Sequence, residues 1–291
     1  MGKLIRAITG DGTIVAYALD ATDMVQRAVD IHQTSAVVTA ALGRLLTAAS
    51  MMGVMLKGKD DSITLRVKAD GPAGTLLAVS DSEGNTKGYV ENPVVEIPLN
   101  TAGKLDVGAA VGHHGTLQVL KDLNLKEPYV GHTPIVSGEI AEDITQYLAT
   151  SEQVPSVCAL GVLVNPDLSV RVAGGFIIQL LPFADEAAIE KLEQNIKHVP
   201  AVTTAMDAGQ TPEDLVRQAL DGFSVEILDE RTADYVCDCS RERVENALRS
   251  MGETELSAMI AEQGGAEVVC HFCGQKYQFN VPELKGLITP K

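Results

Sequence analysis

The chain has 291 residues, a formal net charge of −16 and 45% hydrophobic residues. This length suits one large domain with a smaller one, and the apolar content is sufficient for a core, which excludes a disordered chain. The acidic charge, the 4% aromatic content and the lack of tryptophan argue against a nucleic-acid partner. Nucleic-acid binding needs clustered basic residues and stacking side chains.

The N-terminal stretch MGKLIRAITGDG has no long apolar core or cleavage site, and we expect it to begin a domain. Arg6 stands where a myristoylation signal needs Ser or Thr. We expect no apolar stretch to reach the length of a membrane span. The chain is therefore predicted to be cytoplasmic, with no membrane partner. In that compartment, clustered cysteines favour metal or redox chemistry over structural disulfides.

The first part of the chain alternates between strand and helix patterns. Two apolar runs flank Asp11-Gly12, which is a hairpin signal. Residues 21–58 predict two helices rich in Ala, Leu and Met, with Ser35 as the cap between them. Alternating apolar residues over 62–90 predict an antiparallel meander.

The pattern continues with two further strands over 115–123 and 129–138. An amphipathic helix is predicted over 139–153, and a second hairpin over 156–181. Strand content is high and only a few helices interrupt it. Residues 1–182 therefore predict a large N-terminal α+β domain with a mainly antiparallel sheet and packed helices.

Residues 183–230 predict a helical linker. Ile189, Leu192 and Ile196 form one apolar stripe among charged residues, so this helix is amphipathic. The segment TPEDLVRQALDG adds a second helix that begins after Thr211. Helices this short are marginal in isolation, so we expect the linker to need a neighbouring surface to stay folded.

Residues 231–291 predict a small C-terminal domain. Two short helices follow Ser240 as a cap, and Gly252 and Gly264 end them. The stretch AEVVCHFCGQKYQFNV then predicts a hairpin. At about 60 residues, burial alone stabilises such a unit poorly, and staples are common.

Four of the five cysteines supply a staple. Cys237 and Cys239 form C-x-C, and thirty residues later Cys270 and Cys273 form C-x-x-C followed by Gly274. A glycine permits the positive φ that a metal knuckle often needs. Two close pairs complete a shell of four thiolates, which is the preferred structural environment of Zn²⁺. The sequence therefore predicts a zinc site with these four ligands.

Two interpretations of the site remain open at this point. Structural zinc contributes roughly 10–16 kcal/mol of apparent binding energy in small peptides, so the domain is expected to unfold without it. The zinc is then either an inert staple or part of an oxidation-triggered unfolding switch, because each pair is close enough to form its own disulfide. Nearby Arg231, Arg241 and Arg243 are expected to support thiolate character.

Other candidate residues are given structural interpretations. Cys158 is expected to be a small buried apolar residue. His113 and His114 are expected in a solvated loop, and His271 is not needed beside four thiolates. We predict no enzyme activity, because four cysteine ligands leave no open coordination position. The methionines near the end of the second helix are expected in the core rather than on an adaptable client-binding surface: Met51, Met52 and Met55.

The CDC and CHFC motifs resemble the redox-switch domain of the heat shock protein 33 family of bacterial redox-regulated holdase chaperones. The segment 121–156 and the stretch ALGRLLTAASMMG are also similar to that family, and the resemblance covers essentially the whole chain. It implies one zinc per chain in a reduced, inactive form. It further implies that oxidation joins Cys237 with Cys239 and Cys270 with Cys273, and that zinc is released.

The resemblance also implies the structural consequences of oxidation. The switch domain and linker unfold, apolar surface is exposed, the protein forms a homodimer, and unfolding client proteins are held without ATP under oxidative stress. The alternative is a zinc-ribbon adaptor with a purely structural zinc site, which would retain its metal under mild oxidation and bind its partner in the reduced state.

Overall fold

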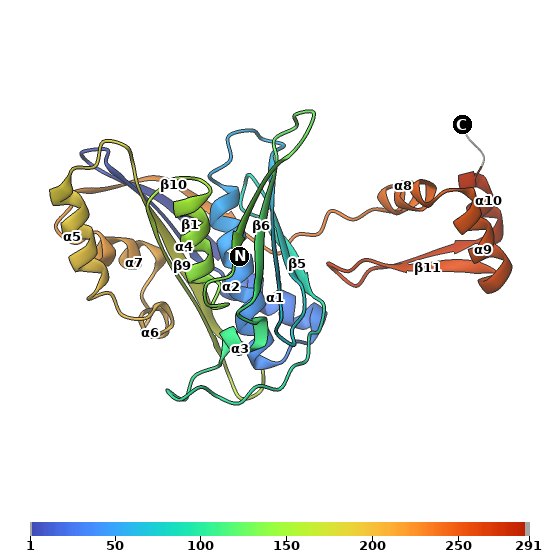
Figure 1. Ribbon diagram of the computed structural model, residues 1–291, viewed down its shortest axis with the longest axis horizontal. Coiled ribbons are helices and arrows are strands. Elements are labelled where there is room, and N and C mark those ends of the chain that lie inside the picture. The colour runs from blue at the N-terminus through green and yellow to red at the C-terminus, as the bar shows by residue number, and fades with distance from the viewer. Residues whose placement is uncertain (1, 289–291) are drawn as a thin grey trace. The chain divides into compact units, whose positions relative to one another are not determined.

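The computed structural model describes residues 2–288, and its contacts divide the chain into two compact units, Met1–Val236 and Cys237–Lys291. Figure 1 shows mixed helices and strands in both units. Every pair of neighbouring strands in the three sheets is antiparallel. The predicted α+β class is therefore confirmed.

The first unit contains a five-stranded sheet, sheet A, with the strand order β10-β1-β2-β9-β8. The predicted hairpin around Asp11-Gly12 joins β1 to β2, and Gly12 has the positive φ of +70° that suits a tight turn. The predicted hairpin over 156–181 is also confirmed. The strands are β1 (Gly2–Thr9), β2 (Ile14–Asp20), β8 (Ser156–Val164), β9 (Val170–Leu180) and β10 (Val225–Ala233).

A second five-stranded sheet, sheet B, has the order β5-β4-β3-β6-β7. Its first three strands are the predicted meander over 62–90, and β6 and β7 are the two further predicted strands. The two sheets could not be separated from the sequence, which had suggested one mainly antiparallel sheet. The strands are β3 (Ser62–Ala69), β4 (Leu76–Asp81), β5 (Thr86–Val90), β6 (Gly115–Asp122) and β7 (Tyr129–Pro134).

Helix α2 (Ala36–Gly53) packs against strands of both sheets and is buried on almost every side. Its 18 residues have a mean hydropathy of 1.4, so the expectation that no stretch reaches the length of a membrane span is wrong by length and composition. Because 89% of the helix is buried inside the fold, α2 is a core helix. Met51 and Met52 are buried within it, as predicted.

Three more helices flank α2 in the first unit. Ser35 stands at the start of α2 as predicted, but its side chain does not cap the helix and donates to the Val95 carbonyl instead. Because α3 has only five residues, its apolar pattern was too short to predict. The helices are α1 (Thr22–His32), α3 (Val107–Val111) and α4 (Ala141–Thr150).

The predicted linker folds as three short helices against the face of sheet A that α2 does not cover (Figure 1). Strand β2 separates the two cores by its alternation, since successive side chains point to opposite faces. Tyr17 and Leu19 join the core around α2, whereas Ala16 and Ala18 join the linker core. The helices are α5 (Glu186–Ile196), α6 (Val202–Asp207) and α7 (Pro212–Ala219).

Helix α7 follows its sequence signals closely. The Thr211 hydroxyl accepts the Asp214 amide, and the Asp214 carboxylate accepts the Thr211 amide in return, which is a capping box. Leu215 and Val216 are fully buried against sheet A. The expectation that these short helices need a neighbouring surface agrees with this packing.

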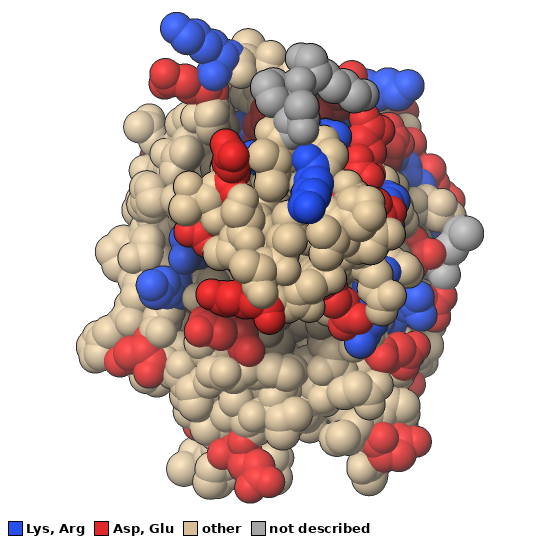
Figure 2. Space-filling model, turned by 90° about the vertical axis from the view of Figure 1, so that its right-hand side faces the viewer, with Lys and Arg blue, Asp and Glu red and all other residues tan. Residues whose placement is uncertain are grey.

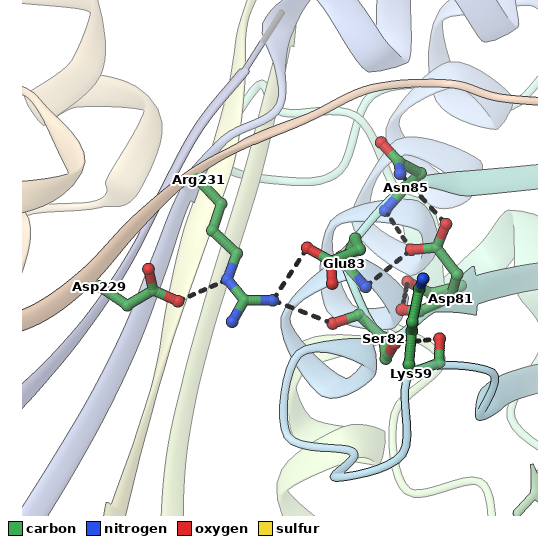
Figure 3. Close-up of polar contacts among 8 residues, drawn as sticks. Lys59, Asp81, Ser82, Glu83, Asn85, Asp229 and Arg231 are labelled. Carbon is green, nitrogen blue, oxygen red and sulfur yellow. Dashed lines mark hydrogen bonds and ion pairs between the residues drawn. The ribbon is translucent and has the colours of Figure 1, made fainter.

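Strand β10 was not predicted from the sequence, and it carries the chain from the linker to the second unit. Figure 3 shows its Arg231 between Asp229 on the same strand and the turn after β4. There the guanidinium group donates to the Glu83 carboxylate and the Ser82 carbonyl, 3.2 Å from each. Arg231, which was expected to begin the C-terminal domain, is thus fastened to the first unit.

The residues after β10 cross to sheet B. Thr86, on the edge strand β5, donates its amide to the Asp234 carbonyl and accepts the Val236 amide, over 2.9 and 2.8 Å. The Tyr235 hydroxyl donates to the Gly88 carbonyl over 2.7 Å. The compact second unit accordingly begins at Cys237, six residues after the predicted start of the C-terminal domain. The functional division into residues 1–182, 183–230 and 231–291 stays a prediction.

Over residues 237–288, the part of the second unit that the structure describes, three helices accompany one hairpin. Ser240 caps the first helix by accepting the Arg243 amide, and Gly252 and Gly264 have positive φ, as the predicted stops suggest. Among its described residues, the buried core consists of five: Leu248, Leu256, Ala266, Phe279 and Leu284. The elements are α8 (Arg241–Met251), α9 (Glu253–Gln263), β11 (Gly265–Val269), β12 (Lys276–Asn280) and α10 (Val281–Ile288), of which α10 was not predicted.

Candidate metal centre

The two cysteine pairs lie on different elements of the second unit. Cys237 and Cys239 precede the N-terminus of α8, and Cys270 and Cys273 lie in the turn between β11 and β12. The turn is closed by the Cys270 amide, which donates to the Gln275 carbonyl, and by the Gly274 amide, which donates to the Cys270 carbonyl, each over 2.9 Å. Gly274 has φ of +72°, as the knuckle interpretation expects.

The fold brings all four sulfurs together. Each Sγ atom lies within 4.8 Å of the other three, and all four thiols are free. Two of the approaches join sulfurs of different pairs, 3.7 Å between Cys237 and Cys270 and 3.3 Å between Cys239 and Cys273. Zn–S bonds of about 2.3 Å in a tetrahedron separate the sulfurs by about 3.8 Å. The arrangement therefore has the donor chemistry and approximate spacing of a four-thiolate metal site.

The environment of the thiols differs from one to the next. Burial raises the pKa of the Cys237 and Cys273 thiols. Burial also acts to raise the pKa of Cys239, but hydrogen bonds, led by the one from Tyr277, outweigh it and lower that pKa below the usual 9.0. Cys239 is thus the thiol whose thiolate the surroundings favour.

Tyr277 was not recognised from the sequence as part of the site. Its hydroxyl donates to Cys239 Sγ over 3.1 Å, and this hydrogen bond raises the pKa of Tyr277 to about 12. The sequence does contain a signal that the Tyr277 side chain faces inward near the cysteines. Tyr277 follows the second cysteine pair on a predicted strand, where it alternates with exposed residues. Its partner Cys239, however, is 38 residues away in the chain.

The predicted role of the three arginines is not what the contacts indicate. Arg241 pairs with Glu245 and Glu283, and Arg243 pairs with Asp238. Arg231 belongs to the first unit, where it pairs with acidic side chains (Figure 3). The guanidinium groups are thus engaged by carboxylates, whereas the hydrogen bonds to the sulfurs come from the Tyr277 phenol at Cys239 and from backbone amides at Cys237 and Cys273.

The remaining candidate residues lie outside the cluster. Cys158 is on β8, partly buried and packed against the core, and burial raises its pKa, so it is an inert apolar residue. His113 and His114 are exposed in the loop before β6, and their backbone amides donate to Asp70. His271 is exposed, and the group of four ligands consists of cysteines.

The family model described as Hsp33 protein matches residues 2–280. The chain belongs to the Hsp33 family. The 33 kDa chaperonin of Lachnoclostridium phytofermentans is 51% identical, and the match covers 98% of each chain. The 33 kDa chaperonin of Clostridioides difficile is 48% identical, again with 98% coverage of each. A crystal structure of the 33 kDa chaperonin of Thermotoga maritima superposes with a TM-score of 0.89 at 37% identity, covering 98% of this chain and 97% of that one.

Membership in the Hsp33 family confirms the resemblance inferred from the cysteine motifs. It makes the chain a redox-regulated chaperone of a family that is not an enzyme family, whose partners are client proteins. The similarity spans both units of the chain.

Proposed function

We propose that Cys237, Cys239, Cys270 and Cys273 bind one Zn²⁺ per chain in the reduced protein, and that this form is inactive as a chaperone. The observation that supports this most directly is the cluster of four free thiols within 4.8 Å of one another. Four thiolates in this arrangement suit zinc better than a hard cation such as Mg²⁺ or Ca²⁺. Bound there, the ion would cross-link the start of α8 to the β11–β12 turn.

Oxidation removes the ligands. Hydrogen peroxide accepts two electrons from the two thiolates of each cysteine pair, its O–O bond breaks, one S–S bond forms, and the two oxygen atoms take up two protons from solvent and leave as two water molecules. The proposed disulfides are Cys237 with Cys239 and Cys270 with Cys273, the pairing that the family resemblance implies. Neither disulfide joins α8 to the hairpin, so the cross-link between these elements is lost together with the metal.

The small core of the second unit explains why ligand loss unfolds it. Five buried side chains form the core among the described residues of the unit, whereas structural zinc contributes about 10–16 kcal/mol of apparent binding energy in small peptides. That contribution is as large as the whole net stability of a typical domain. The zinc-free, oxidised unit is therefore expected to be unfolded.

The linker helices are the second element of the proposed activation. They cover an apolar face of sheet A whose side chains would be exposed if α5, α6 and α7 detached. An exposed apolar patch of this kind binds other apolar surfaces. Detachment would thus provide a surface for unfolding client proteins without ATP, and the same exposure would favour a homodimer.

The charge distribution is consistent with protein clients. In the face shown in Figure 2, basic side chains are interspersed with acidic ones and form no continuous patch. With the net charge of −16, this supports the proposal that nucleic acid is not a partner. We also propose a cytoplasmic location, where reduced thiols and a zinc-bound resting state are the norm.

The experiment combines zinc release with client aggregation. Full-length protein is treated with peroxide at mild heat, zinc is measured with a chromogenic chelator, and light scattering of a heat-denaturing client is followed. We expect one zinc per reduced chain, none after oxidation, and suppressed aggregation only in the oxidised sample.

Two variants sharpen this test. Cys158→Ala removes a thiol outside the cluster and should leave zinc content and activation unchanged, whereas Cys239→Ser should weaken zinc retention. If zinc survives oxidation and aggregation is unaffected, the zinc-ribbon adaptor with a purely structural metal is the better description.

A further inference from the structure

Tyr277 reaches the metal centre from a fixed position on β12. Its side chain shares a face of the strand with Phe279, which is fully buried, while Lys276 and Gln278 on the other face are exposed. Across the hairpin Tyr277 is opposite Val268, and both pack against the core of the second unit. The ring is thus held by packing, and its hydroxyl points at a sulfur.

The hydrogen bond makes the four ligands unequal. Cys239 accepts a phenol hydroxyl at 3.1 Å, whereas Cys237 accepts the backbone amide of Cys239 and Cys273 accepts that of Gln275. A hydrogen bond to a charged sulfur is stronger than one between neutral groups. It stabilises the thiolate and engages an electron pair that would otherwise attack an oxidant.

We propose that Tyr277 is a positioning residue for the redox switch: its hydroxyl holds Cys239 at the metal and slows oxidation of the Cys237–Cys239 pair. This inference rests on the proposed zinc site. The reaction is the one described above, in which peroxide takes two electrons from two thiolates, takes up two protons from solvent and becomes two water molecules. The phenol keeps its proton throughout, so Tyr277 changes the rate and not the products.

Tyr277→Phe tests the inference because it removes one oxygen atom and retains the ring that packs beside Phe279. Two control variants accompany it in the full-length protein. Tyr129→Phe makes the same change on the half-exposed β7 strand of the first unit. Val268→Ala loosens the packing opposite Tyr277 and keeps the hydroxyl.

The measurement follows each pair separately. Reduced, zinc-loaded proteins are treated with peroxide, and free thiols are trapped by alkylation at timed intervals. Trypsin then cleaves next to Arg231, Arg241, Arg249 and Lys276, which places the two cysteine pairs on the different peptides 232–241 and 250–276 for mass spectrometry. Zinc retention is measured in parallel by competition with a chromogenic chelator.

We expect Tyr277→Phe to oxidise the Cys237–Cys239 pair about tenfold faster, which corresponds to about 1.4 kcal/mol. The other pair should change less than twofold, and the chelator should remove zinc sooner. If Tyr277→Phe retains no zinc while Val268→Ala retains it, the result also supports this role of the hydroxyl. Tyr129→Phe should behave like the wild type.

Three results would overturn the inference: unchanged rates in Tyr277→Phe, equal acceleration of both pairs, or the same selective acceleration in Val268→Ala. These results can be distinguished from a failure of the proposed function itself. In that case the wild-type protein itself would keep its zinc and four thiols under peroxide, or its oxidised form would not suppress client aggregation.

Discussion

Leu215 offers the sharpest test of how the linker controls the apolar face of sheet A. It lies in α7, is fully buried, and packs in the core formed with β1, β2 and β9. Replacing a buried leucine with alanine costs about 2.7–5.0 kcal/mol in well-studied cases. A loss of about 3 kcal/mol raises the population with α7 detached about 150-fold, since each 1.4 kcal/mol is a factor of ten.

We therefore expect Leu215→Ala to become an active chaperone at lower peroxide concentrations than the wild type. The assay is light scattering of a heat-denaturing client across a peroxide series. The matched control is Leu65→Ala, an equally buried leucine on β3 of sheet B. This control should lower the melting temperature of the first unit without lowering the peroxide threshold. If both variants shift the threshold equally, or if neither does, linker detachment from sheet A is not the controlling step.

Three further predictions concern other parts of the chain. Burial lowers the pKa of His32 below its usual 6.5, so its contribution to stability is present above pH 6.5 and is lost as the pH falls toward the lowered pKa. In His32→Gln the free energy of unfolding of the first unit, measured by urea unfolding, should therefore change less between pH 7 and 5.5 than in the wild type. Thr211→Val removes the capping hydroxyl of α7 and should destabilise that helix by about 1 kcal/mol. We expect faster amide exchange in α7 and a slightly lower peroxide threshold for activation than in the control Thr145→Val, which removes a hydroxyl from α4. Cys270→Ser should weaken zinc binding, reduce the helical circular dichroism of the second unit and give partial chaperone activity without oxidant; a variant that stayed zinc-loaded and inactive would count against metal-coupled folding.

Local patterns predicted most elements of the fold but not how they assemble. The Asp11-Gly12 hairpin, the meander over 62–90 and the capping signals at Thr211 and Ser240 all depend on neighbouring residues, and the structure confirms them. The division into sheets A and B depends on strand pairings between distant segments. The sequence of β2 likewise gives no indication that its two faces pack into different cores. Such pairings cannot be derived from one sequence alone.

The omission of β10 has a more specific cause. Its residues VEILDERTA alternate between half-buried and exposed positions, which is a strand pattern, but they fall across the predicted boundary between the linker and the C-terminal domain and were assigned to no element. Edge strands are typically charged, so composition alone concealed this one. Its pairing with β1 and the contacts of Arg231 then place the start of the second unit at Cys237.

In the candidate site, too, the local features could be predicted from the sequence and the long-range contacts could not. The cysteine motifs predict four ligands because the spacing of each pair is local, and the structure brings the four sulfurs together. The hydrogen bond from Tyr277 to Cys239 depends on the tertiary fold of the second unit, and so does the engagement of Arg241 and Arg243 by carboxylates. The clustering of the four cysteines could therefore be predicted, whereas the groups that contact them and adjust their reactivity could not.

Amide hydrogen exchange of the full-length protein, before and after peroxide oxidation, tests most directly whether the cysteine cluster controls the linker. In the reduced, zinc-loaded protein the amides of α5, α6 and α7 should be protected. In the oxidised protein we expect protection to be lost in these helices and in Cys237–Lys291, while sheet B keeps it. Complete oxidation of the four cysteines with unchanged protection in the linker helices would contradict the account.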